Sequence, residues 1–202
     1  MRTANELSKK VRAPEYQVPG PGEKPPAFLT VPVTVARKAI STYHEHGATA
    51  ARDYLRSSKV GRWANHPNPS MATSNGNVLA GFDAYVVADL ADGRSAKGLA
   101  LSAVLAWPAG PLKVRLDVVL ADGDGLAARA LLWDGHNLSE SQAPLIAAPY
   151  AAALEQLHPE ALLTSIDVWQ ARRQMHFEVP IESALGEVRA AQRLQFSLAA
   201  SP

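Results

Sequence analysis

The chain of 202 residues lacks cysteine, and its charges are almost balanced. The absence of cysteine excludes disulfides, thiolate metal sites and cysteine nucleophiles, and it fits a cytoplasmic protein. The 20 Lys and Arg residues against 19 Asp and Glu leave a formal net charge of +1. Bulk charge therefore does not indicate binding to nucleic acid or to an anionic membrane, and a nucleic-acid site would have to be a local basic patch.

Long apolar stretches are also missing. No run reaches the roughly 18 residues of a membrane-spanning helix, and the first residues lack the apolar segment of a signal peptide. These features predict a cytoplasmic protein without a membrane partner. Apolar residues still make up 47% of the chain, which is enough to bury a substantial core.

The most regular pattern lies at residues 112–134, with the sequence LKVRLDVVLADGDGLAARALLWD. Leucine or valine occupies every second position from 112 to 120, and Lys113, Arg115 and Asp117 lie between them. This alternation predicts a half-buried strand with its apolar residues on one face. The Asp-Gly steps at 122–125 predict a tight hairpin, and residues 126–133 would form the returning strand.

Before this hairpin the sequence predicts a flexible arm at residues 1–26, rich in proline and glycine. A helix begins at Thr34 as N-cap and breaks near Gly47. A long loop is expected at 61–77, where Pro, Asn, Ser and Gly accumulate. Two further elements complete this half: a helix at 76–90, favoured over a strand, and a strand at 97–107.

After the hairpin a helix is expected from about Ser141, with Pro144 in its first turn, Pro149 bending or shortening it, and His158-Pro159 ending it. Strands follow at 164–172 and 175–179, and a final helix begins at Pro180. The fold class is therefore α+β, or α/β-like: a central mixed sheet in the order α-βββ-α-ββ-α behind an N-terminal helical segment. We expect one domain at 27–202, with its core at 75–198.

This order resembles that of the PD-(D/E)xK nuclease superfamily, in its RecB-type exonuclease branch, over roughly residues 75–198. Asp117 in VRLDVVL falls where the family has its metal-binding Asp, and Tyr150 falls on the expected Tyr. The segment SIDVWQARRQMHFEVP is similar to the family's last hairpin. The resemblance implies a sheet that presents Asp117 toward a nuclease-like site.

The same resemblance implies a degenerate site. Ala127 and Arg129 stand where the family has Glu and Lys. Ile146 occupies the Gln position, with Gln142 one turn earlier, and Asp83 lies where some members have Glu. Mg²⁺ needs hard oxygen ligands, and arginine is permanently protonated and cannot act as a base. We therefore expect no cofactor, and a pseudo-nuclease that binds nucleic acid or acts as a scaffold in a bacterial or phage DNA-processing or defence assembly.

Two alternatives remain open. An active enzyme would be a Mg²⁺-dependent nuclease with a rearranged catalytic set of Asp83, Asp117 and Asp134, or an irregular metal site that adds His136 to Asp117. A protein-interaction module would meet its partner through residues 1–26 or the 61–77 loop.

A DNA or RNA partner would need a phosphate-binding surface. The candidate residues are basic side chains on the predicted strands and at the last hairpin: Lys113, Arg115, Arg129, Arg172 and Arg173. An ordinary solvated sheet face is the competing interpretation. Two other features favour structural roles: Trp133 and Trp169 are expected to pack in the core, and His44 and His46, two residues apart, are expected on a helix surface without a shared metal.

Overall fold

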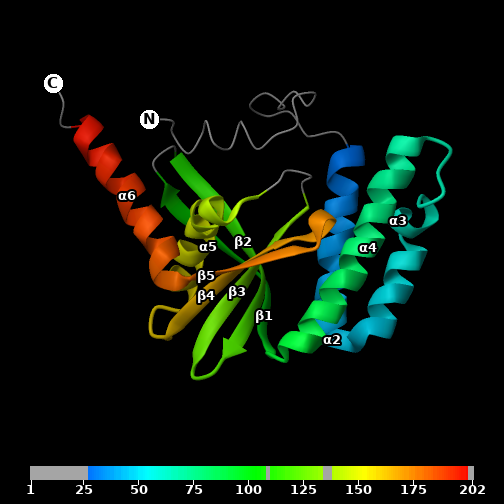
Figure 1. Cartoon of the computed structure of the whole chain (residues 1–202), viewed down its shortest axis with the longest axis horizontal. Helices are drawn as coiled ribbons and strands as arrows, with labels where there is room; N and C mark the ends of the chain where they lie inside the picture. Colours follow the sequence, from blue (N-terminus) through cyan, green and yellow to red (C-terminus); the bar gives the residue numbers. More distant parts are fainter. Residues whose placement is uncertain (1–26, 108–109, 134–137, 200–202) are drawn as a thin grey trace. The chain divides into compact units, whose positions relative to one another are not determined.

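The computed structural model describes residues 27–107, 110–133 and 138–199, with side chains throughout except at 27–31, 172 and 192–199. The described residues divide into two compact units, and Figure 1 labels the helices and strands that belong to them. The helical unit contains residues 27–93, Trp133 and residues 170–175. The sheet unit contains residues 94–107, 110–132, 138–169 and 176–199. Among the described residues, no helix combines the length and apolarity needed to cross a bilayer.

The helical unit starts with α2 (Ala27–Ser57), followed by α3 (Lys59–Arg62) and α4 (Pro69–Asp92). The predicted start at Thr34 was wrong, because α2 begins at Ala27 and includes Pro32. Pro32 lies in the second turn, where it removes only one backbone hydrogen bond. The predicted break at Gly47 is confirmed by its φ of 85° inside α2.

The predicted loop at 61–77 was wrong for most of its length. Only residues 63–68 connect α3 to α4, because Asn68 caps α4 by accepting from the Ser70 and Met71 N–H groups at 3.0 and 3.4 Å. Pro69 suits the first helical turn, where its missing N–H needs no partner. The Ser- and Asn-rich run after it is helical, and the predicted helix at 76–90 is confirmed up to Gly93, whose φ is 73°.

The five-stranded sheet consists of β1 (Ala96–Trp107), β2 (Gly110–Asp122), β3 (Gly125–Leu132), β4 (Leu163–Gln170) and β5 (Met175–Pro180), in that spatial order. The first three strands pair antiparallel. Thr164 Oγ1 donates to the Leu126 carbonyl, and Asp167 accepts from Arg129, both contacts spanning 38 residues. This constant offset shows that β4 runs parallel to β3, so the sheet is mixed and the predicted α+β fold class is confirmed.

Helix α5 (Ala143–Leu157) packs on one face of the sheet, and α6 (Ile181–Ala199) packs against α5 and adds residues to the same core. Between β3 and α5 lies the short 3-10 helix η1 (Glu140–Gln142), and between β4 and β5 lies η2 (Ala171–Arg173). Alanines of α5, including Ala147 and Ala151, are fully buried in this core, where their small side chains allow close approach to the strands. Pro149 lies inside α5, and the helix still reaches its predicted end at His158.

The alternation of β2 shifts by one residue within the strand. Val114 and Leu116 belong to the core under α5, but the next member of that core is Val119 rather than the predicted Val118. The shift occurs opposite Ala100 of β1, which has a left-handed φ of 56° that non-glycine residues rarely adopt. The predicted single apolar row from 112 to 120 was therefore wrong beyond Leu116.

This shift places the charged residues of the middle strands on one surface. Arg115 and Asp117 are bonded to each other and flank the core residue Leu116. Arg129 pairs with Val118 and lies between two core alanines of β3. Asp167 contacts Arg129 and likewise lies between core residues of β4. All four side chains project from the face turned away from α5, which we call the polar face.

Candidate functional site: the polar face of the sheet

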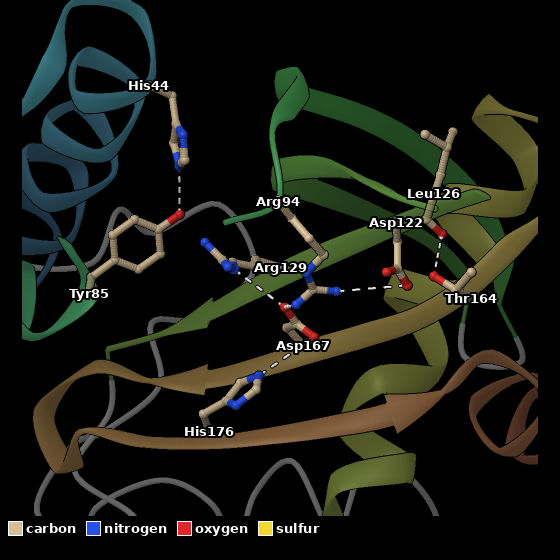
Figure 2. A network of polar contacts seen from close by, with 9 residues as sticks. All are labelled: His44, Tyr85, Arg94, Asp122, Leu126, Arg129, Thr164, Asp167 and His176. Atoms are coloured by element: carbon tan, nitrogen blue, oxygen red, sulfur yellow. Dashed lines mark hydrogen bonds and ion pairs between the residues drawn. The ribbon is translucent and has the colours of Figure 1, made fainter. Parts of the chain in front are cut away.

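Asp167 is the centre of a buried ionic cluster on the polar face (Figure 2). Its Oδ2 accepts from Arg94 Nη2 at 2.6 Å and from Arg129 Nε at 3.3 Å. His176 of β5 places its Nε2 3.5 Å from the other carboxylate oxygen, Oδ1. Arg94 also lies 4.0 Å from Asp122. The cluster therefore links the segment before β1 to strands β2, β3, β4 and β5.

The ionisation of Asp167 follows from this environment. The residue is 0% exposed, and burial alone would raise its pKa. The contact with His176 and the positive charges of Arg94, His176 and Arg129 outweigh burial, so the pKa of Asp167 lies below its ordinary value. Asp167 is thus a carboxylate at neutral pH, and its negative charge is already matched by guanidinium groups.

Asp117, the predicted metal ligand, has a similar counter-ion. Its Oδ1 accepts from Arg115 Nε at 3.2 Å, and the aspartate is buried whereas the Arg115 side chain is 40% exposed. On the polar face, three carboxylates thus lie beside three guanidiniums: Asp117, Asp122 and Asp167 with Arg94, Arg115 and Arg129. Such a face is close to neutral and has the character of a structural ion network.

The polar face is open at one end. Lys113 and Arg115 of β2 pair with Val104 and Ser102 of β1, and Pro111 pairs with Ala106. All of these residues are exposed or partly exposed, and Val104 is 60% exposed. We call this region the open end: two cations beside small and apolar side chains. Its exposed cations distinguish it from the buried cluster at Asp167.

The structure does not bring the predicted catalytic set together within one described site. Asp83 lies on α4 in the helical unit, exposed and bound to Arg52 at 3.1 Å, whereas Asp117 lies in the sheet unit. Asp134 and His136 lie outside the described residues. Among the residues that the structure does describe, no three His, Asp or Glu side chains gather into a group able to hold a metal ion.

The predicted phosphate-binding set is divided as well. Lys113 and Arg115 lie on one face of β2 at the open end. Arg129 is 5% exposed and bound to Asp167, so it faces a carboxylate in place of a phosphate. Arg173 belongs to the helical unit, and the side chain of Arg172 is not among those described.

The positions matched by the family resemblance serve structural purposes. Ala127 is fully buried and pairs with Leu120 of β2. Gln142 accepts from the Ser139 N–H at 3.0 Å in a capping box at the start of η1. Gln142 is itself the N-cap of α5, which begins at Ala143 and not at the predicted Ser141. Tyr150 and Ile146 pack against the core under α5.

Sequence reasoning missed several polar contacts. It gave no role to Asp167, Arg94 or His176, although an aspartate in the apolar run SIDVW signals a buried charge that needs partners. It placed His44 on a helix surface, whereas His44 Nε2 lies 2.7 Å from the hydroxyl of the buried Tyr85 (Figure 2). A buried phenol needs such a partner, but residues 41 positions apart give no local pattern that reveals it.

The tryptophans occupy positions that are typical of structural residues. Trp133 and Trp169 are both buried, and the ring of Trp169 lies 5.8 Å from that of His176. Trp63, in the connection between α3 and α4, lies beneath the ammonium group of Lys59 at 5.7 Å and beside His66. The core packing predicted for Trp133 and Trp169 is thus confirmed by their burial.

Compared with protein-family models and with curated protein sequences, the chain shows no match.

Proposed function

We propose that the chain is a non-catalytic, nuclease-like subunit that binds nucleic acid through the open end of the polar face, within a bacterial or phage DNA-processing or defence assembly. The observation that carries the proposal is the contrast between the two parts of that face. Its buried carboxylates are paired with arginines of the same unit, whereas at the open end Lys113 is exposed and Arg115, which bonds Asp117, is still 40% exposed.

The absence of catalysis is supported by the chemistry at the matched positions. Ala127 supplies no ligand where the family has an acidic residue, and Asp117 is bonded to Arg115. Arg129 bonds Asp167 and cannot accept a proton. A lone, neutralised carboxylate does not hold Mg²⁺ in the way that phosphodiester cleavage requires.

Nucleic-acid binding is supported by the geometry of the open end. Lys113 and Arg115 are two residues apart on one strand, so their side chains leave the same face about 7 Å apart. Within the described chain Lys113 makes no ion pair, and Arg115 bonds Asp117 through Nε only. Both cations can therefore contact phosphate oxygens, and the β1 residues beside them, Ser102, Val104 and Ala106, are exposed and uncharged.

Fluorescence anisotropy tests the binding. We expect labelled double-stranded DNA or single-stranded RNA to bind at about 50 mM salt, with affinity falling as salt rises because two phosphate contacts release about two counter-ions. The double variant Lys113→Glu/Arg115→Glu should bind at least ~10-fold more weakly. A matched control, Lys38→Glu/Lys97→Glu, makes the same change in net charge at exposed lysines elsewhere. Absence of binding at low salt, or equal losses in both variants, would refute the proposal.

A cleavage assay tests the second half of the proposal. With Mg²⁺ or Mn²⁺ and either nucleic acid, we expect substrate to remain intact. Cleavage that disappears in Asp117→Ala would instead establish a metal-dependent nuclease with a rearranged site, since a contaminating nuclease would be unaffected by that change.

A further inference from the structure

The two edges of the five-stranded sheet differ in how they are protected. An edge strand exposes unpaired backbone N–H and C=O groups, and proteins limit this with short strands, proline and charged side chains. The β5 edge has these features: it spans six residues, contains His176 and Glu178, and ends at Pro180. It therefore offers little to an incoming strand.

The β1 edge lacks them. It spans 12 residues, AKGLALSAVLAW, without proline and with Lys97 as its single charge. From Leu101 to Trp107 every residue keeps an unbroken register with β2, so this segment is a straight, regular edge. At its midpoint Val104 is 60% exposed. Within the described residues no strand pairs with the outer side of β1.

We infer that a second copy of this chain pairs with this edge, with residues 101–107 of the two copies running antiparallel about a twofold axis at Val104. This arrangement is self-complementary, as a twofold interface requires. Val104 meets Val104 of the other copy, Ser102 meets Ala106, and Ala103 meets Leu105. These pairs contain no charge, and the exposed valines cover each other.

Charge also permits the pairing. Lys97 lies outside the paired segment, at the far end of β1. The Lys113 side chains of the two copies stand on strands separated by three strand spacings, about 14 Å. That distance exceeds the Debye length of roughly 8 Å at physiological salt, so their repulsion is screened. An acidic peptide would gain little from an edge with a single lysine at its end.

Cross-linking tests the inference with little background, because the chain contains no cysteine. In an antiparallel pair, opposite Cα atoms lie about 4.5–5.5 Å apart, within the range that a disulfide spans. Under mild oxidation, full-length Val104→Cys should therefore form a disulfide-linked dimer. Val87→Cys, at a similarly exposed valine of α4, should stay largely monomeric on a denaturing gel.

Light scattering coupled to size-exclusion chromatography completes the test. The unaltered chain should have a dimer mass that falls toward the monomer on dilution, and Val104→Lys should be monomeric while Val87→Lys remains dimeric. Circular dichroism confirms that each variant is folded. A monomer at ~100 µM, a persistent dimer in Val104→Lys, or no disulfide in Val104→Cys would overturn the inference. This inference is independent of nucleic-acid binding, so either proposal can fail alone.

Discussion

Two arginines on the same face of one sheet differ in what they contact. Arg129, in β3, is buried and bound to Asp167, which also bonds Arg94. Arg115, in β2, is 40% exposed and uses only Nε for Asp117. Both arginines have a buried aspartate as partner, and only the exposure of the arginine side chain differs. Basic residue type and strand position therefore do not by themselves identify a binding residue.

The difference has an energetic basis. Removing one partner of a buried ion pair leaves an uncompensated charge and costs about 3–5 kcal/mol. An exposed pair contributes about 0–1 kcal/mol because water screens it. The two ends of the polar face should therefore respond differently to equivalent substitutions.

The largest effect is expected for Asp167→Asn. This change leaves Arg94 and Arg129 without their shared carboxylate, and we expect the free energy of unfolding to fall by about 3–5 kcal/mol. Urea denaturation followed by circular dichroism measures it. Arg115→Ala serves as the comparison from the open end, and equal losses in the two variants would show that the two ends of the polar face contribute equally to stability.

Lowering the pH should remove the contribution of Asp167 to the free energy of unfolding. Its folded-state pKa lies below the unfolded value of about 3.9. The carboxylate therefore contributes its full stability above about pH 5, and this contribution is lost as pH falls through the folded pKa. The difference in unfolding free energy between the unaltered chain and Asp167→Asn should shrink as pH is lowered from 5 toward 3. A difference that stays constant over this range would show that folding does not lower the pKa of Asp167.

At the open end we expect small effects on stability and larger ones on binding. Arg115→Ala should cost about 1 kcal/mol, because Asp117 is buried but its partner is half exposed. Lys113→Ala should change stability by less than ~0.5 kcal/mol. Each should reduce the slope of log affinity against log salt by about one. Thermal unfolding and anisotropy titrations measure the two quantities, and a large loss of stability in Lys113→Ala would place that residue in the fold's own network.

Local patterns in the sequence predicted most of the elements. Alternation located β2, the Asp-Gly steps located the β2–β3 turn, where Gly123 has a φ of 57°, and Pro180 preceded α6. The errors came from side chains acting at short range. Asn68 and Pro69 start α4 inside a stretch whose composition is typical of a loop.

The candidate site was less predictable because its contacts cross the sheet. Asp117 and Arg115 form a local pair that alternation can suggest. The described partners of Asp167, which are Arg94, Arg129 and His176, come from three separate segments, and its contact with Arg94 spans 73 residues. The shift of alternation opposite Ala100 depends on the left-handed backbone conformation of that residue, which cannot be predicted from an alanine in the sequence.

The parallel pairing of β3 with β4 has a consequence for how the sheet assembles. β1, β2 and β3 join through short connections, so their contacts are local and can form early. β4 is expected to pair with β3 later, after α5 has formed and packed on the sheet, because the contacts between β3 and β4 close a loop of 38 residues. Until β4 pairs, Arg129 lacks the carboxylate of Asp167. We therefore expect this ion pair to form late in folding, after the transition state, so that it slows unfolding more than it speeds folding.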